Sequence, residues 1–172
     1  MAEQHNSQVS IERIEDLSIV SLKVSSKSIE NARNSLQLAA PASTSNGDPR
    51  SLWFGPDRWL LVSESKSADL MVEECEKSLV DVLHNAVDNS AGLAVFRLTG
   101  TGARDLLAAG SGVDFRADRF PAGYCCRTRL AQIAAIIAAG GPEQFDIYVD
   151  RSYGTYINDW LKDSLSISVN ER

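Results

Sequence analysis

The sequence predicts an α+β protein of two packed lobes, each an antiparallel sheet with helices on one face and the element order β-α-β-β-α, with a possible final strand. Three observations lead to this prediction. Segments of strand length alternate with segments whose apolar residues recur at helical spacing. A Gly-Pro-acidic-x-aromatic turn occurs twice, at residues 55–59 and 141–145, which are 86 residues apart. Each copy is flanked by strand-like runs and followed by an amphipathic helix, which indicates an internal duplication.

The first lobe is predicted over residues 11–90 and begins with a strand. Apolar and polar residues partly alternate over residues 11–24, so we predict one strand that ends near Ser25. A short helix is predicted after Ser28. Its apolar stripe consists of Ile29, Ala32, Leu36 and Ala39. Residues 40–50 hold two prolines, a glycine and small polar residues, a composition typical of a surface loop.

The rest of this lobe is predicted as a hairpin, a helix and a strand. Residues 52–54 and 58–63 flank Gly55-Pro56-Asp57, which indicates two strands joined by a turn. A helix is predicted from Ala68, because apolar and charged residues fall on opposite faces. Its apolar face consists of Met71, Val72, Cys75, Leu79, Val82 and Leu83. Residues 84–88 are predicted as a strand leaving the helix.

The second lobe, residues 91–172, is predicted to repeat this order. A strand over residues 93–99 and a short helix over residues 100–109 precede an irregular segment at residues 111–124. Residues 130–139 match helical spacing, but we predict a strand there because the repeated turn follows it. The last helix is predicted after an N-cap at Ser152. Its apolar face consists of Tyr153, Tyr156, Ile157, Trp160, Leu161 and Leu165.

Composition places the chain among globular proteins that are not bound to membranes. Of its 172 residues, 44% are hydrophobic and 23% are charged, enough to bury a sizeable core. The formal net charge of −6 disfavours binding to nucleic acid. No apolar run approaches the ~20 residues of a membrane-spanning helix. Residues 1–10 are polar and lack the features of a targeting signal, so we expect a flexible N-terminal tail and a cytoplasmic protein.

The residues that could do chemistry do not assemble into a catalytic site, and we expect no catalytic, cofactor-binding or metal-ligating residue in this chain. His5 lies in the predicted tail, and His84 is interpreted as a structural histidine rather than a base. Gly100 and Gly102 follow a predicted strand, as in dinucleotide-binding loops. Asp105, however, stands where a third small residue would pack, so we interpret the segment as a strand-to-helix turn.

The cysteines are odd in number and include the adjacent pair Cys125 and Cys126, which fits the reduced thiols of a cytoplasmic protein. Arg127 and Arg129 beside the pair favour a lowered thiol pKa, whereas free cysteines commonly serve as small core residues. Both interpretations are open at this point. The sequence has no Cys-x-x-Cys pair and no clustered histidines, so a zinc site is not expected.

The remaining charged residues of interest lie in the second lobe. Arg127, Arg129 and Arg151 bracket the irregular segment and the last helix. Because arginine is enriched at interfaces and in carboxylate recognition, we interpret them as structural or interfacial residues, with a small-anion site as the alternative. Asp146 and Asp150 flank a predicted strand and are interpreted as solvated surface.

Several short motifs stand out, mostly from Ser51 onward. They are Gly55-Pro56-Asp57-Arg58-Trp59-Leu60-Leu61, Ala86-Val87-Asp88-Asn89-Ser90, Leu98-Thr99-Gly100, Ala103-Arg104-Asp105-Leu106-Leu107-Ala108, Phe120-Pro121-Ala122-Gly123 before Arg127-Thr128, and Asp150-Arg151-Ser152 with Asp159-Trp160-Leu161. Together they resemble the gamma subunit of heterotetrameric sarcosine oxidase. That family is similar in fold to the folate-binding aminomethyltransferase group, which suits the predicted duplication.

The resemblance implies a non-catalytic subunit of an assembly with alpha, beta and delta subunits. That assembly demethylates sarcosine to glycine with O2 and tetrahydrofolate, giving H2O2 and methylene-tetrahydrofolate, and so links sarcosine catabolism to one-carbon metabolism. The resemblance further implies that FAD, FMN, NAD and tetrahydrofolate belong chiefly to the larger subunits and zinc to the smallest. The gamma motifs define no catalytic residue, so none is carried over. The implied role is assembly and stability, through packing on the large subunit that carries the folate domain.

We expect the packing surface at an apolar face of the second lobe, because exposed apolar surface usually marks a contact site. Its predicted residues are Phe115, Phe120, Tyr124, Arg127 and Arg151. The alternative function is a stand-alone folate-binding protein of the aminomethyltransferase group, with tetrahydrofolate in a cleft between the lobes. A dinucleotide-dependent oxidoreductase is the third hypothesis.

Overall fold

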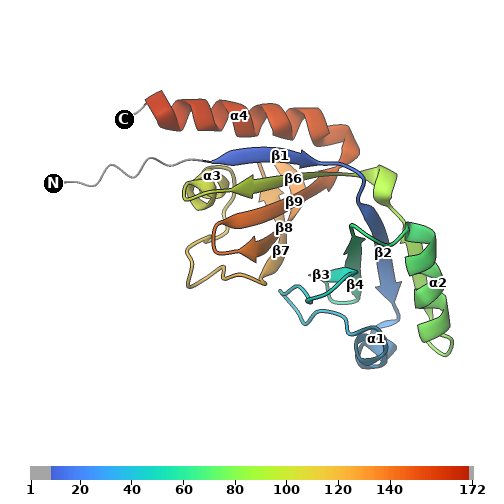
Figure 1. The fold of residues 1–172 in the computed structure, drawn as a ribbon. Helices are drawn as coiled ribbons and strands as arrows, with labels where there is room; N and C mark the ends of the chain where they lie inside the picture. Colours follow the sequence, from blue (N-terminus) through green and yellow to red (C-terminus); the bar gives the residue numbers. More distant parts are fainter. Residues whose placement is uncertain (1–8, 171–172) are drawn as a thin grey trace.

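Two antiparallel sheets form the framework of the chain in a computed structural model that describes residues 9–170 (Figure 1). The five-stranded sheet contains, in spatial order, β1 (Ser10–Ile14), β6 (Leu93–Thr99), β9 (Gln144–Asp150), β8 (Ile133–Gly141) and β7 (Cys125–Leu130). The four-stranded sheet contains β3 (Arg50–Gly55), β4 (Arg58–Ser63), β2 (Ser18–Val24) and β5 (His84–Asp88). The predicted α+β class with two antiparallel-sheet units is confirmed.

The helices complete each half of the molecule. They are α1 (Ile29–Leu36), α2 (Ala68–Ser78), α3 (Ala103–Gly110) and α4 (Gly154–Asn170), with single 3-10 turns at Ser26–Ser28, Ser90–Gly92 and Arg151–Tyr153. Figure 1 shows α1 and α2 beside the four-stranded sheet, and α3 and α4 beside the five-stranded sheet. Among the described residues, no helix combines the length and the apolar character that crossing a bilayer requires.

The duplication is visible in the backbone. The β3–β4 and β8–β9 hairpins contain the two Gly-Pro turns, and each hairpin has a register shift at the same place. The first shift lies between Trp53 and Gly55, and the second lies 86 residues later, between Ala139 and Gly141. Such a bulge sharpens the local twist of a hairpin. The order β5-β2-β4-β3 therefore matches β1-β6-β9-β8, with β7 added beyond it.

The N-terminal strand shows how the halves are joined. The single strand predicted over residues 11–24 is wrong, because the chain bends between β1 and β2 (Figure 1), where Asp16 has a φ of 59°. β1 pairs with β6 of the second half, and β2 pairs with β4 and β5 of the first. β1 thus occupies the place beside β6 that β5 occupies beside β2. The possible final strand predicted for the second half is therefore present, but it is β1 and comes from the N-terminal segment.

Two further segments differ from the sequence prediction. Residues 125–129, for which no strand was predicted, form β7 together with Leu130. The strand predicted over residues 130–139 begins only at Ile133, because the chain turns at Ala131 and Gln132, whose φ values are 49° and 72°. Two successive residues with positive φ suit a tight hairpin turn. α2 ends at Ser78, so Val82 and Leu83 are not on its apolar face. Leu83 is instead 81% exposed.

Three groups of buried residues hold the layers together. One lies between the four-stranded sheet and α1 and α2, and includes Trp59 and Met71. A second lies between the five-stranded sheet and α3 and α4, and includes Phe96 and Leu161. The third joins the inner faces of the two sheets. Its members are Ile19, Leu52, Leu60, Val62, Val95, Cys125, Ala138 and Tyr148. The two sheets therefore share a core, and the helices cover the outer faces.

Candidate functional site

The five residues predicted to form the packing surface do not lie together on one exposed face. Phe115 and Phe120 are buried in the core of the second half, so their assignment to an exposed face is wrong. Tyr124 is 37% exposed. Arg127 on β7 and Arg151 after β9 are exposed, and their role at an interface stays a prediction.

A cluster of aromatic rings explains the burial of the two phenylalanines. The ring centroids of Phe115 and Phe120 are 5.0 Å apart, and those of Phe120 and Phe145 are 6.2 Å apart. Arg104 fixes the irregular segment that carries them, because its Nη1 donates to the Phe120 carbonyl (3.0 Å) and its Nη2 to the Pro142 carbonyl (2.7 Å). The Arg104 guanidinium also lies 4.9 Å from the Phe145 ring centroid. The two phenylalanines and Arg104 therefore anchor an otherwise largely exposed segment to the core.

An ionic cluster lies between the two sheets and was missed by sequence reasoning. Asp146 is 1% exposed, so its interpretation as solvated surface is wrong. Arg97 donates from Nε (2.7 Å) and Nη2 (3.2 Å) to the two oxygens of this carboxylate. Arg50 of the other sheet donates from Nη2 to Asp146 Oδ2 (2.9 Å) and to Tyr148 Oη (3.0 Å). One buried carboxylate thus connects arginines from both halves.

The pKa values of Arg50, Arg97 and Tyr148 in the cluster are raised. Burial raises the pKa of Tyr148 to about 12, so its hydroxyl is neutral over the physiological range. Burial by itself lowers the pKa of the Arg50 guanidinium, but the neighbouring Tyr148 and Asp146 outweigh it and raise the pKa overall. A hydrogen bond to Asp146 likewise raises the pKa of Arg97. Both arginines stay charged, and the hydrogen bonds of the cluster connect the two sheets.

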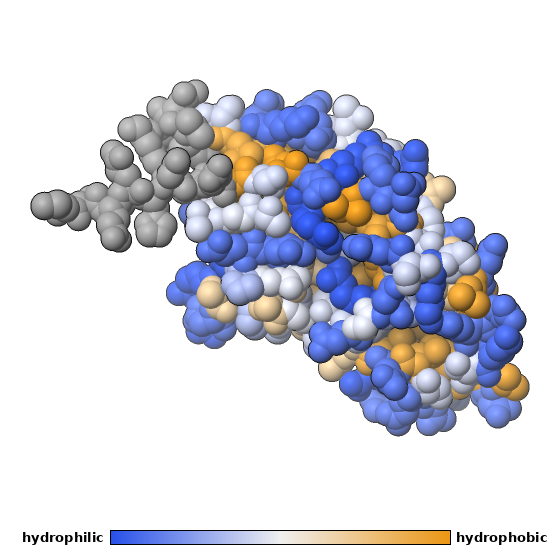
Figure 2. Space-filling view, viewed as in Figure 1, coloured by the Kyte–Doolittle hydropathy of each residue, from blue (hydrophilic) through white to orange (hydrophobic). Residues whose placement is uncertain are grey.

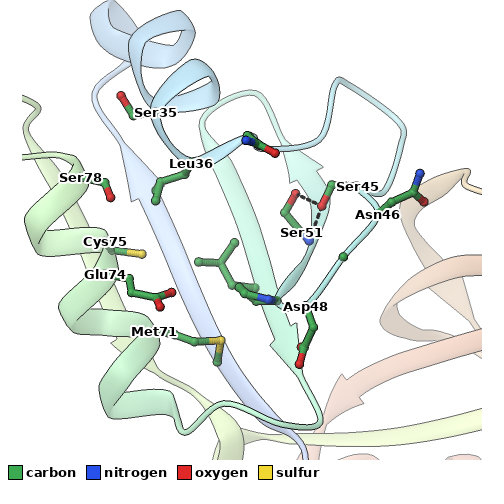
Figure 3. A pocket seen from close by; sticks show the side chains of 14 residues that line it. Ser35, Leu36, Ser45, Asn46, Asp48, Ser51, Met71, Glu74, Cys75 and Ser78 are labelled. Atoms are coloured by element: carbon green, nitrogen blue, oxygen red, sulfur yellow. Dashed lines mark hydrogen bonds between the residues drawn. The ribbon is translucent and has the colours of Figure 1, made fainter.

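A pocket of about 350 Å³ opens in the first half between α1, α2 and the loop before β3 (Figure 3). Leu61, Met71 and Cys75 give it apolar lining, and Asp48 and Glu74 contribute carboxylates. Glu74 is paired with Lys66 (2.7 Å between Oε1 and Nζ). Asp48 accepts a hydrogen bond from Ser65, and hydrogen bonds with Ser63 and Ser65 lower its pKa. Both carboxylates have partners within the chain, so they do not mark a ligand.

The space between the sheets is occupied by protein side chains. The shared core and the ionic cluster lie where the alternative hypothesis would place tetrahydrofolate. The described residues 9–170 also bring together no group of three or more His, Cys, Asp or Glu side chains that could hold a metal ion.

The pKa values of the three thiols are raised by burial, not lowered. Burial raises the pKa of Cys75 to about 11, of Cys125 to about 12 and of Cys126 to about 11. The lowered pKa that Arg127 and Arg129 favoured is therefore wrong for the cysteine pair. The Cys125 thiol lies 3.3 Å from the Trp53 carbonyl oxygen, within the core between the sheets. These cysteines serve as small core residues.

Thiol reactivity should follow from these values. At pH 8 we expect the native protein to react with Ellman's reagent roughly a hundredfold more slowly than free cysteine, because the thiolate is the reacting form. The rate should rise as the pH approaches the pKa of about 11 of Cys126, which is the most exposed of the three. Stopped-flow absorbance from pH 7 to 10 measures this, with the protein in denaturant as the reference. A native rate equal to that of free cysteine would contradict the burial of the thiols.

The duplicated scaffold with helices on its outer faces defines a known class of fold. It is similar to the glycine cleavage system aminomethyltransferase T from Bartonella henselae, with a TM-score of 0.67 and 14% sequence identity over 90% of this chain and 45% of that chain. This is the fold class that the sequence motifs implied.

Within that class, the chain belongs to the sarcosine oxidase gamma subunit family, whose model matches residues 28–167. The sarcosine oxidase subunit gamma of Corynebacterium sp. (strain U-96) is 27% identical over 115 residues, which are 67% of this chain and 55% of that protein. The match thus spans little more than half of that relative. The structure of heterotetrameric sarcosine oxidase from Corynebacterium sp. U-96 in complex with pyrrole 2-carboxylate matches with a TM-score of 0.82 and 22% identity, over 92% of this chain and 84% of that chain.

Proposed function

We propose that this chain is a non-catalytic gamma subunit of a heterotetrameric sarcosine oxidase and acts in its assembly and stability. The observation that carries the proposal is the family match over residues 28–167, which includes both halves of the scaffold. The side-chain chemistry described above agrees with it. The thiols are protonated at neutral pH, and the buried carboxylate Asp146 is held by two arginines.

The partners in this proposal are the alpha, beta and delta subunits of the complex. The cofactors belong to those partners: FAD, FMN, NAD and tetrahydrofolate to the larger subunits and zinc to the smallest. The complex as a whole would oxidise sarcosine to glycine with O2, give H2O2, and pass the methyl carbon to tetrahydrofolate. This chain would contribute a rigid surface on which the large subunit packs.

Co-expression with and without this chain tests the proposal. The alpha, beta and delta subunits encoded in the same genome are produced with the gamma chain, or without it, and purified through a tag on alpha. We expect the chain to elute with the other three in equal amounts. Its omission should lower the yield and thermal stability of the complex, and the isolated chain should not oxidise sarcosine. A chain that oxidises sarcosine alone, or that never joins the other subunits, would overturn the proposal.

Calorimetry with tetrahydrofolate distinguishes the proposed function from the alternative. A stand-alone folate-binding protein would bind tetrahydrofolate as an isolated chain, whereas a supporting subunit would give no heat of binding. The side chains that fill the space between the sheets favour the second outcome.

A further inference from the structure

The two sheets have four edges, and three of them are covered or carry charges. The segment at residues 42–45 covers two edges, because Thr44 bridges to Leu52 of β3 and Ser43 bridges to Tyr124 just before β7. The third edge, β1, carries the charged residues Glu12 and Arg13 at its centre, which discourage pairing with another strand, whereas the one carboxylate of β5, Asp88, lies at the end of that strand. The fourth edge, β5, has the sequence His-Asn-Ala-Val-Asp and pairs only with β2 among the described strands.

The free side of β5 presents an ordered row of backbone groups. The Ser25 N–H donates to the Leu83 carbonyl (2.8 Å), and the Asn89 N–H donates to the Ile19 carbonyl (2.7 Å). These two bonds place the odd-numbered residues of this segment against β2. Backbone groups of successive residues point to opposite sides in an antiparallel ladder, so His84, Ala86 and Asp88 direct their N–H and C=O groups away from the sheet. The β2–β5 register is continuous, without a bulge that would block a further strand.

Exposed apolar side chains line the same edge. Leu83 and Val87 are 81% and 48% exposed, and by strand alternation they share one face of the sheet. Val80, in the loop between α2 and β5, is 78% exposed. A pocket of about 410 Å³ lies at the start of β5, lined by Leu83, His84 and Asn85 together with residues 23–26 and Asp57, so it opens toward β2 rather than along the free edge. Figure 2 shows apolar atoms at the surface beside the lower end of α2, where this loop lies.

The border of this edge is acidic. Glu76 at the end of α2, Asp81 in the loop and Asp88 at the end of β5 are exposed; the neighbouring cations are Lys23 on β2 and Lys77, which pairs with Glu73. Hydrogen bonds from Ser90 lower the pKa of Asp88, which keeps its charge at neutral pH. A segment that fits this border carries lysine or arginine next to its apolar residues.

We propose that the β5 edge, from Val80 to Asp88, binds an extended segment of the large partner subunit, which adds a fifth strand to the four-stranded sheet. The inference rests on the proposed function and names the surface it uses. The unpaired backbone row favours a strand over a helix as the occupant. Leu83 and Val87 would contact apolar side chains of that strand, and the acidic border would contact its basic residues.

Hydrogen exchange and binding measurements test this with the purified complex of the other three subunits. On addition of that complex, we expect the backbone amides of Ala86 and Asp88 to become protected from exchange. The double variant Leu83→Lys/Val87→Lys should raise the dissociation constant by ~10-fold or more. The matched control is Leu70→Lys, because Leu70 is 43% exposed and lies at the start of α2, at the opposite end of that helix from the loop before β5; it should change the dissociation constant by less than about twofold. Ala86→Pro, which removes an outward N–H without touching the bonds to β2, should weaken binding as well.

The outcomes are distinguishable. If the wild-type chain does not bind the three-subunit complex, the proposed function fails and this inference fails with it. If the wild-type chain binds but the double variant binds equally well, only the β5 edge is wrong. Protection of the same amides in the free chain overturns the inference too: it indicates a second copy if it depends on concentration, and a segment of the same chain if it does not.

Discussion

Asp146→Ala is expected to lower the free energy of unfolding by about 3–5 kcal/mol, one of the two largest effects of any substitution considered for this chain. The carboxylate is 1% exposed and accepts hydrogen bonds from Arg50 and Arg97, which belong to different sheets. Its removal leaves two partly buried guanidinium groups without their counter-charge, which costs more than the cavity alone. Urea denaturation followed by tryptophan fluorescence measures the loss. Asp146→Asn, which keeps the shape but not the charge, should give a smaller loss.

The control for Asp146 is an exposed pair of the same chemistry. Asp114 also forms two-oxygen contacts with an arginine, Arg116, but at the surface, where water screens the charges. Asp114→Ala should therefore leave the unfolding curve nearly unchanged. Equal effects of the two substitutions would show that the ionic cluster does not connect the sheets. A triple variant that replaces Arg50, Arg97 and Asp146 with apolar residues should recover part of the stability, because no charge is then left unpaired.

The sequence was sufficient for the parts of the fold that local signals specify. The repeated Gly-Pro turn located both hairpins, and it identified β8 as a strand although Ile133, Ile136 and Ile137 match helical spacing. The turn succeeded because hairpin geometry depends on a few adjacent residues. The prediction of a single strand over residues 11–24 was wrong because it depended on local signals alone. The bend at Asp16 separates two segments with similar β propensity, and only their partners, β6 and β4, show that they belong to different sheets.

The candidate sites depended on contacts that local patterns do not contain. Asp146 is separated by 96 residues from Arg50 and by 49 from Arg97, so its neighbours in the sequence did not indicate that its charge would be paired. One signal was available: Asp146 lies between Phe145 and Ile147 in a strand predicted within a packed lobe. The exposed edge at Leu83 was missed because the helical spacing continued past Ser78, where α2 ends.

Phe120→Ala is expected to lower the free energy of unfolding by about 3–5 kcal/mol, because it empties a space at the centre of the second half. Phe120 is 1% exposed and contacts the rings of Phe115, Phe145 and Tyr124. The sequence prediction placed this residue on a packing surface, where its loss would weaken binding and leave the isolated chain stable. The structure predicts the reverse. Urea denaturation of the isolated chain and titration against the three-subunit complex, at a temperature where the variant is folded, measure the two quantities separately.

Tyr124→Ala is the matched control, because Tyr124 belongs to the same aromatic cluster but is 37% exposed. Its substitution removes less buried area, so the loss of stability should be well below that of Phe120→Ala. If Phe120→Ala instead leaves stability unchanged and weakens binding, residues 111–124 rearrange when the complex forms and the ring leaves the core. That result would return part of the interface to the second half, where the sequence analysis placed it, while the β5 edge would still be tested by the Leu83→Lys/Val87→Lys variant.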